Sequence, residues 1–84
     1  MERSDLEQRL LTLLTRVAPD VDPASVDPAR PLREQFDFDS MDMLHFAASV
    51  SEAFGVPIAE REYSALTSLK GAADLVTRKL AMPQ

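Results

Sequence analysis

Cysteine and tryptophan are both absent from this chain of 84 residues. Without cysteine the chain can form no disulfide, no thiolate metal site and no cysteine nucleophile, so any thiol chemistry needs a thiol supplied from elsewhere. Aromatic side chains make up only 6% of the residues. The core must therefore be built mainly from aliphatic side chains and alanine.

Basic residues are also scarce, with nine Lys and Arg against fourteen Asp and Glu, for a net charge of −5. We expect no nucleic-acid partner, because nucleic acid requires a basic stripe that displaces counterions. An acidic surface instead favours basic protein partners. The N-terminus lacks the apolar run of a signal peptide, and no stretch reaches membrane-spanning length. We therefore expect a cytoplasmic, monomeric protein with no stable membrane insertion and a single domain over residues 1–84.

Apolar residues recur at helical spacing, and no segment is typical of a strand. We expect helices at residues 4–17, 40–54, 60–66 and 68–81, with a long ordered loop over 18–39. Such a loop is unusual in so small a domain, but its apolar residues indicate that it packs across the helices. The sequence predicts an all-α fold, a small four-helix bundle of three principal helices and one short helix.

Helix ends carry recognisable signals. Ser4 and Glu7 form the pattern of a capping box, Thr67 or Ser68 is expected to cap the last helix, and Gly55 suits a left-handed C-terminal position. The expected core stripe is Met43, Phe46, Ala47, Val50, Ala53 and Phe54 in the second long helix, and Leu69, Ala72, Ala73, Val76 and Leu80 in the last.

The stretch "DFDSMDM", residues 37–43, presents Ser40 among acidic side chains at the start of the second long helix. No G-x-S-x-G elbow surrounds it. The only histidine, His45, lies five residues further on, about 140° around the helix, and cannot act as general base for Ser40. Hard-cation sites need converging oxygen ligands, and no such spacing is present. We therefore predict no catalytic residue and no metal site.

Three interpretations of Ser40 remain open from the residues alone. Ser40 or Asp39 simply caps the helix, with Asp42 interacting favourably with its dipole, which is the commonest role of such residues. Alternatively, the chain is a non-carrier helical adaptor in which the serine is phosphorylated. The third possibility is an attached phosphate or phosphodiester, which suits the free amides of a helix N-terminus.

"LREQFDFDSMDMLHFAASVSEAFGVPI", followed by "ALTSLKGAADLV", resembles the acyl carrier protein family over essentially the whole chain. The family pattern of two spaced apolar residues, Gly-x-Asp-Ser-Leu-Asp and a helix ending in Phe maps onto Leu32, Phe36, Asp37, Phe38, Asp39, Ser40, Met41, Asp42 and Phe54. The resemblance implies an acyl-carrier-like fold and a free-standing carrier rather than an enzyme. It also implies that Ser40 bears 4′-phosphopantetheine, whose thiol carries acyl groups as thioesters.

The partners implied by this resemblance are a phosphopantetheinyl transferase and acyl-loading or acyl-transferring enzymes, namely synthases, ligases or acyltransferases of fatty-acid, polyketide or specialised pathways. The implied partner-recognition residues are Asp39, Met41, Asp42, His45 and Glu52. Residues that could line a space for the acyl chain, or simply form the core, are Phe46, Ala47, Val50, Ile58, Ala65, Leu66 and Leu69.

The chain also departs from the family pattern. Asp37 stands where the family usually has glycine, Phe38 is bulkier than usual, and His45 and Ser51 replace residues that are often acidic in fatty-acid carriers. We therefore expect weaker binding to fatty-acid enzymes and a specialised carrier. A peptidyl carrier is the nearest alternative, but such domains typically have glycine pairs before the serine.

Overall fold

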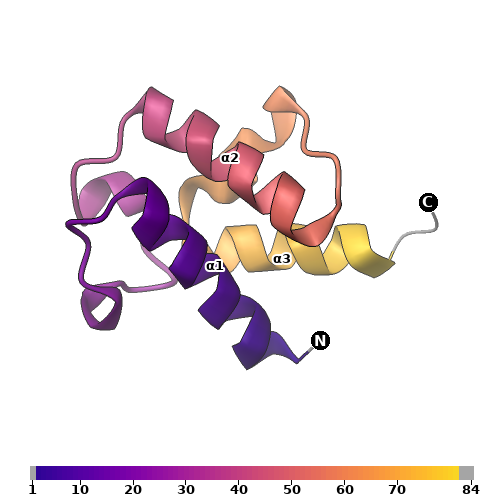
Figure 1. The fold of residues 1–84 in the computed structure, drawn as a ribbon, viewed down its shortest axis with the longest axis horizontal. Helices are drawn as coiled ribbons and strands as arrows, with labels where there is room; N and C mark the ends of the chain where they lie inside the picture. Colours follow the sequence, from indigo (N-terminus) through magenta and orange to yellow (C-terminus); the bar gives the residue numbers. More distant parts are fainter. Residues whose placement is uncertain (1, 82–84) are drawn as a thin grey trace.

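The computed structural model describes residues 2–81 and shows a small helical bundle, with no strand among these residues (Figure 1). The expected all-α four-helix bundle is confirmed. No helix within the described range is both long and apolar enough to cross a membrane. In chain order the elements are α1 (Arg3–Val17), the 3₁₀ turns η1 (Pro23–Ser25) and η2 (Leu32–Glu34), α2 (Ser40–Phe54), the longer 3₁₀ helix η3 (Glu60–Thr67) and α3 (Leu69–Ala81).

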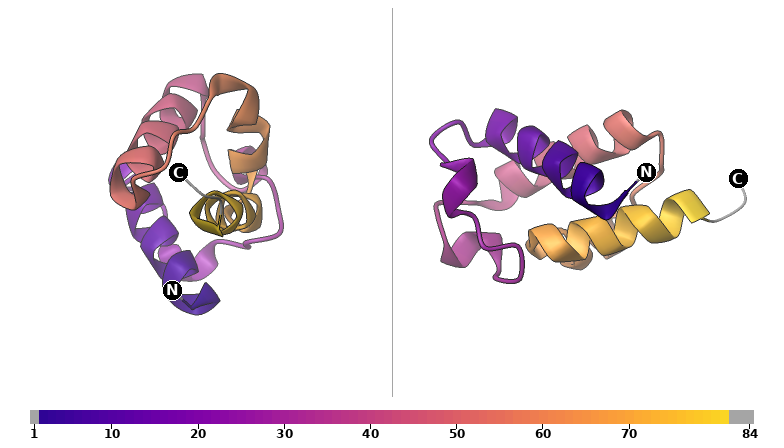
Figure 2. Two further views of the ribbon diagram at one scale, coloured as in Figure 1. Left: turned by 90° about the vertical axis from the view of Figure 1, so that its right-hand side faces the viewer. Right: turned by 90° about the horizontal axis from the view of Figure 1, so that it is seen from below.

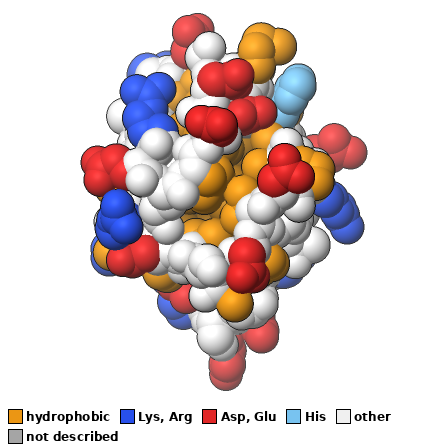
Figure 3. Space-filling view, turned by 90° about the vertical axis from the view of Figure 1, so that its left-hand side faces the viewer, with side chains coloured by type: hydrophobic (Ala, Val, Ile, Leu, Met, Phe, Trp, Pro, Cys, Tyr) orange, Lys and Arg blue, Asp and Glu red, His pale blue; other side chains and the backbone are white. Residues whose placement is uncertain are grey.

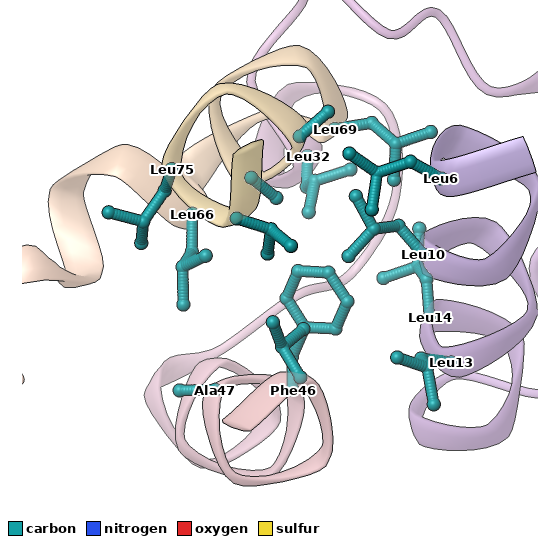
Figure 4. Packing of buried hydrophobic residues seen from close by; sticks show 14 of the residues in the cluster. Leu6, Leu10, Leu13, Leu14, Leu32, Phe46, Ala47, Leu66, Leu69 and Leu75 are labelled. Carbon is teal, nitrogen blue, oxygen red and sulfur yellow. The ribbon is translucent and has the colours of Figure 1, made fainter. Parts of the chain in front are cut away.

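The core lies where α1, α2, α3 and η3 meet (Figure 2). The Phe46 ring projects from α2 into this space, toward the leucines of α1 (Figure 4). Aliphatic side chains surround the Phe46 ring, so a chain with few aromatic residues can still form a packed core. The buried cluster comprises Leu6, Leu10, Leu13, Leu14, Leu32, Phe38, Phe46, Ala47, Val50, Leu66, Leu69, Ala72, Ala73, Leu75 and Val76.

The connection between α1 and α2 packs against the bundle. Leu32, the first residue of η2, is fully buried. The Gln35 side chain accepts a hydrogen bond from the Asp27 backbone amide at 2.7 Å and donates to the carbonyls of Asp27 and Arg30. The Lys70 amide of α3 also donates to the carbonyl of Pro28 at 2.9 Å. Burial and backbone hydrogen bonds thus fix the segment that leads into α2.

The predicted capping box at the start of α1 is wrong. The helix begins one residue earlier, with Glu2 at the N-cap position and no side chain bound to its free amides. Glu7 does not reach back to Ser4, because its carboxylate instead accepts a hydrogen bond from Arg3 Nε at 3.2 Å. Arg3 also pairs with Asp74, which joins the first turn of α1 to α3.

Two stripe positions differ from expectation. Ala53 and Leu80 are exposed, whereas Leu75, which lies outside the predicted stripe, is buried. The packing of η3 against α3 covers Leu75, and it lies beside Leu66 of η3 in Figure 4. Helical periodicity identifies one buried face, but it does not show how far a neighbouring element widens that face.

The other helix ends agree with the sequence signals. Ser68 Oγ accepts a hydrogen bond from the Gly71 amide at 3.0 Å, so Ser68 rather than Thr67 caps α3. Gly55 follows α2 in the left-handed conformation, with φ of 66°. The expected short helix at residues 60–66 is present as η3, although it is a 3₁₀ helix and includes Thr67.

Replacing Gly71 by alanine is expected to destabilise the fold, although alanine usually stabilises a helix interior by about 1 kcal/mol relative to glycine. A Cβ atom at this position would overlap the backbone carbonyl oxygen of Ala65. We expect the free energy of unfolding to fall by about 1–3 kcal/mol in urea denaturation. Gly55→Ala is the comparison, because a Cβ there meets open space and only the positive φ penalises it. A more stable G71A variant would contradict this packing.

Candidate functional site at the start of α2

Asp39, and not Ser40, caps α2. The Asp39 carboxylate accepts a hydrogen bond from the Asp42 amide at 2.9 Å, and the Asp42 carboxylate accepts one from the Asp39 amide at 3.1 Å. This reciprocal pair is a capping box in which aspartate replaces the more usual glutamate at the third position. It resolves the alternative that the sequence left open between Asp39 and Ser40.

The hydroxyl of Ser40 is consequently free. Ser40 is the first residue of α2 and its side chain is exposed. Within residues 2–81, no side chain or backbone group forms a hydrogen bond with its Oγ. The helix holds the backbone of Ser40 rigidly while the oxygen atom faces solvent.

Replacing Asp39 by alanine is expected to lower the free energy of unfolding by about 1 kcal/mol, the usual cost of losing an N-cap side chain. The change removes the acceptor for the Asp42 amide. Chemical denaturation should show this loss, whereas Asp37→Ala, which removes an exposed carboxylate outside the capping box, should change stability by less than about 0.5 kcal/mol. Equal stability of the two variants would show that the cap is energetically unimportant.

A groove of about 730 Å³ opens beside Ser40, between the start of α2, η2 and η3. Its volume lies within the range of small-molecule binding sites. Apolar and polar side chains share its wall, so it suits a ligand that is itself mixed in character. The lining residues are Pro31, Arg33, Glu34, Phe38, Asp39, Ser40, Met41, Met43, Leu44, Glu60, Tyr63, Ser64 and Thr67.

The residues that precede Ser40 are fixed by aromatic packing rather than by a glycine turn. Phe38 is buried and makes edge-to-face contacts with Phe36 and Phe46, with ring centroids 5.9 Å and 6.3 Å away. Among the described residues only Gly55 has a positive φ, so Asp37 adopts an ordinary backbone conformation. The large Phe38 side chain anchors this segment to the core and so fixes the entry into α2.

The comparisons with known proteins agree with this geometry. Residues 8–76 match the family described as "Phosphopantetheine attachment site". The chain is 33% identical over 75 residues to "Polyketide-8 synthase acyl carrier protein 2" of Streptomyces avermitilis, covering 89% of this chain and 86% of the relative. It is 30% identical over 76 residues to "Acyl carrier protein" of Rubrobacter xylanophilus, covering 90% of this chain and 93% of the relative. The chain belongs to the acyl carrier protein family.

The prosthetic group of this carrier family is 4′-phosphopantetheine, and the residues at the start of α2 fit it. The free, exposed Ser40 hydroxyl adjoins a groove with both apolar and polar lining. A pantetheine arm is likewise mixed, because its amide and hydroxyl groups alternate with short hydrocarbon segments. When bound, the group supplies the thiol that this carrier lacks, since its sequence contains no cysteine.

Acidic side chains surround the start of α2. On the face at which α2 begins, apolar side chains lie in a hollow bordered by many acidic groups (Figure 3). Asp37 and Asp39 are exposed, and Asp42 is half-buried because its carboxylate takes part in the capping box. This charge attracts basic partners, but it also opposes an added phosphodiester.

The predicted partner-recognition residues lie along α2. Met41 is 56% exposed, and His45 and Glu52 are exposed further along the helix. Leu44, which was not among the predicted site residues, is 46% exposed and lines the groove together with Met41. Met41 and Leu44 therefore add exposed apolar surface beside the acidic residues, and the recognition roles remain predictions.

The residues predicted to line an acyl space lie in the core and not on the groove. Ile58 and Ala65 are half-buried, and the remaining candidates are almost fully buried. None of them lines the groove beside Ser40. Their lining role therefore remains a prediction about the loaded carrier. The core candidates are Phe46, Ala47, Val50, Leu66 and Leu69.

An ion pair holds η3, one wall of the groove, against α3. Lys79 Nζ lies 2.8 Å from the Glu62 carboxylate, and the two side chains are only 19% and 21% exposed. Glu62 also accepts a hydrogen bond from the Ala59 amide at 2.9 Å. The hydrogen bond from Lys79, followed by that from Ala59, holds the pKa of Glu62 below its ordinary value.

Acidification is expected to weaken this attachment. Because the pKa of Glu62 is lowered in the folded state, its contribution to stability is present above the ordinary pKa of 4.5 and is lost as the pH falls through the folded-state value. The pKa of Asp74 is lowered too, mainly by Lys70 and then by Arg3. The dependence of wild-type stability on pH therefore does not report on Glu62 alone. Below pH 4.5, unfolding curves should show the stability difference between wild type and Glu62→Gln shrinking, whereas Glu52→Gln should follow wild type. If the stability of wild type and E62Q changed in parallel with pH, Glu62 would not contribute to the attachment of η3 to α3.

Proposed function

We propose that Ser40 is the residue to which phosphopantetheine is attached, and that the chain shuttles acyl groups between partner enzymes. The observation that carries this proposal is the free hydroxyl of Ser40 at the start of α2, where Asp39 performs the capping. A serine needed as a cap would have its oxygen occupied. Here the oxygen is available, and it adjoins a groove suited to the arm.

The attachment is a phosphoryl-group transfer with coenzyme A as donor. Ser40 Oγ forms a bond to the phosphorus that bears the pantetheine arm, and the bond from that phosphorus to the departing phosphate oxygen breaks. Adenosine 3′,5′-bisphosphate leaves, and the hydroxyl proton passes to a base. Asp39 and Asp42, the carboxylates adjacent to Ser40 at the start of α2, are engaged in the capping box, and His45 lies on another side of the helix. We infer that the transferase supplies the base.

Ser40 then acts as a rigid anchor for a flexible tether. Because α2 fixes its backbone, the volume that a tethered thioester can explore is limited, which raises its effective concentration at a docked enzyme. The exposed Met41 and Leu44 beside the anchor provide apolar contact for that enzyme. His45 and Ser51 carry no acidic charge, so a basic enzyme surface gains less from this helix.

We further propose a polyketide-type or other specialised acyl pathway. The name of the Streptomyces avermitilis relative refers to a polyketide synthase, and the reduced acidity of α2 points away from partners selected mainly by charge. Acyl transfer from the loaded chain should be faster with a polyketide-type condensing enzyme than with a fatty-acid one. The opposite order would reject this assignment without affecting the carrier role.

The carrier role is tested by incubating the apo chain with coenzyme A and a broad-specificity phosphopantetheinyl transferase. Intact mass should increase by a single phosphopantetheine group. A folded chain that gains no such group would overturn the proposal. If the chain instead acquires one phosphate from an acid-directed kinase, the phosphorylated adaptor becomes the better interpretation.

A further inference from the structure

The groove beside Ser40 has a single cationic side chain in its lining, that of Arg33. We propose that the Arg33 guanidinium pairs with the phosphodiester that a loaded Ser40 bears, and so directs the arm along the groove. This inference rests on the proposed attachment at Ser40. It adds an anion-binding residue on η2, outside the segment that carries the family pattern's Asp-Ser pair.

Arg33 is available for such a contact. Among residues 2–81, no carboxylate lies within ion-pair distance of its guanidinium. Its neighbour Glu34 is directed toward Arg30, with 3.9 Å between the charged atoms. Arg33 also borders a second hollow with Asp37, Asp39 and Asp42, so its side chain lies where the two hollows adjoin.

The backbone of Arg33 is held firmly. The preceding residue, Leu32, is fully buried in the core, and the amide of Gln35 closes the turn by donating to the Leu32 carbonyl at 3.0 Å. With the backbone already fixed, pairing costs only the conformational entropy of the side chain. Although Arg33 is exposed, its position relative to the groove is therefore defined.

A cation is needed here because the other charges are unfavourable. Loading Ser40 adds a negative phosphodiester beside Asp39, and Glu34 and Glu60 line the same groove. The start of α2 contributes partial positive charge, but the Asp39 and Asp42 carboxylates already occupy part of it. A guanidinium binds a phosphate through two parallel N–H groups, which fixes direction as well as supplying charge.

The test begins with intact-mass verification that wild type, Arg33→Gln and Arg61→Gln are loaded. Arg61 is the matched control, because it is an exposed arginine on η3 that does not line the groove. If wild type is not loaded, the proposed function is wrong. If it is loaded, phosphorus NMR of the three loaded proteins tests Arg33 separately.

We expect the phosphodiester resonance of loaded R33Q to narrow and to move toward the position of phosphopantetheine in an unfolded carrier, because the group is no longer held. Loaded R61Q should match wild type. The same change should occur in wild type when salt is raised to about 1 M, at which the screening length is about 3 Å. Identical phosphorus shifts and linewidths in wild type and R33Q would overturn the proposal.

The Arg33 side-chain resonance provides a second readout that does not depend on loading a variant. In wild type, its Nε–Hε signal should shift and exchange more slowly with solvent after loading. If Arg33 only screens the neighbouring aspartates, this signal will be the same in the apo and loaded proteins. That result would also contradict the proposed pair.

Discussion

Replacing Ser40 by alanine is expected to abolish phosphopantetheine loading completely and to leave the fold intact. The change removes the accepting oxygen, whereas the capping box of Asp39 and Asp42 remains. Because the lost hydroxyl is exposed and has no partner among residues 2–81, the free energy of unfolding should stay within about 0.5 kcal/mol of wild type. Intact mass and urea denaturation measure the two outcomes independently.

Two control variants separate chemistry from folding. Asp39→Ala keeps the hydroxyl and should still become fully loaded, although more slowly, because Asp39 is one of the predicted partner-recognition residues. Ser4→Ala removes another exposed serine hydroxyl and should be loaded like wild type. Loading of S40A would show that another residue accepts the group. A large loss of stability in S40A would show that the hydroxyl has a structural role that the observed capping box does not reveal.

Replacing Phe46 by alanine is expected to have the largest effect on stability. The ring is fully buried at the centre of the bundle (Figure 4). It also packs edge-to-face on Phe38, which lies two residues before Ser40. Truncating such a residue typically costs about 3–5 kcal/mol. A domain of this size has only a modest free energy of unfolding, so F46A should be largely unfolded at 37 °C, as measured by circular dichroism.

Phe46→Leu retains most of the volume and should cost less than about 1.5 kcal/mol, so it keeps the prediction measurable if F46A does not fold. Phe54→Ala tests the same residue type at a half-buried position, where the ring lies 4.8 Å below the Arg9 guanidinium, and should cost less than F46A. Similar losses for F46A and F54A would show that the centre of the bundle is loosely packed. A loose centre would in turn favour Phe46 as a residue that moves aside for an acyl chain.

Helix positions could be predicted from the sequence because apolar spacing and terminal residues act locally. Gly55 and Ser68 mark ends that the structure confirms. The start of α1 could not be predicted in the same way. There Glu7 is drawn away from Ser4 by Arg3, which also pairs with Asp74 from the far end of the chain. A local capping rule has no access to such a distant contact.

The site was predicted in part. Its serine and acidic neighbours are adjacent in the sequence, so the family pattern could locate them. The groove could not be predicted, because Arg33, Tyr63 and Thr67 reach it from η2 and η3 only after the bundle has formed. Leu44 could not be predicted as part of the site, because it lies off the apolar stripe of α2. Its exposure beside Met41 became evident only in the structure.

Tandem mass spectrometry of the loaded wild-type chain tests the central claim most directly. Trypsin should release a peptide over residues 34–61, which contains Ser40, Ser49 and Ser51, so fragmentation within the peptide is required. Every fragment containing Ser40 should carry the phosphopantetheine mass, and fragments that begin after it should not. Location of the group on Ser49, Ser51 or any other residue would contradict attachment at Ser40.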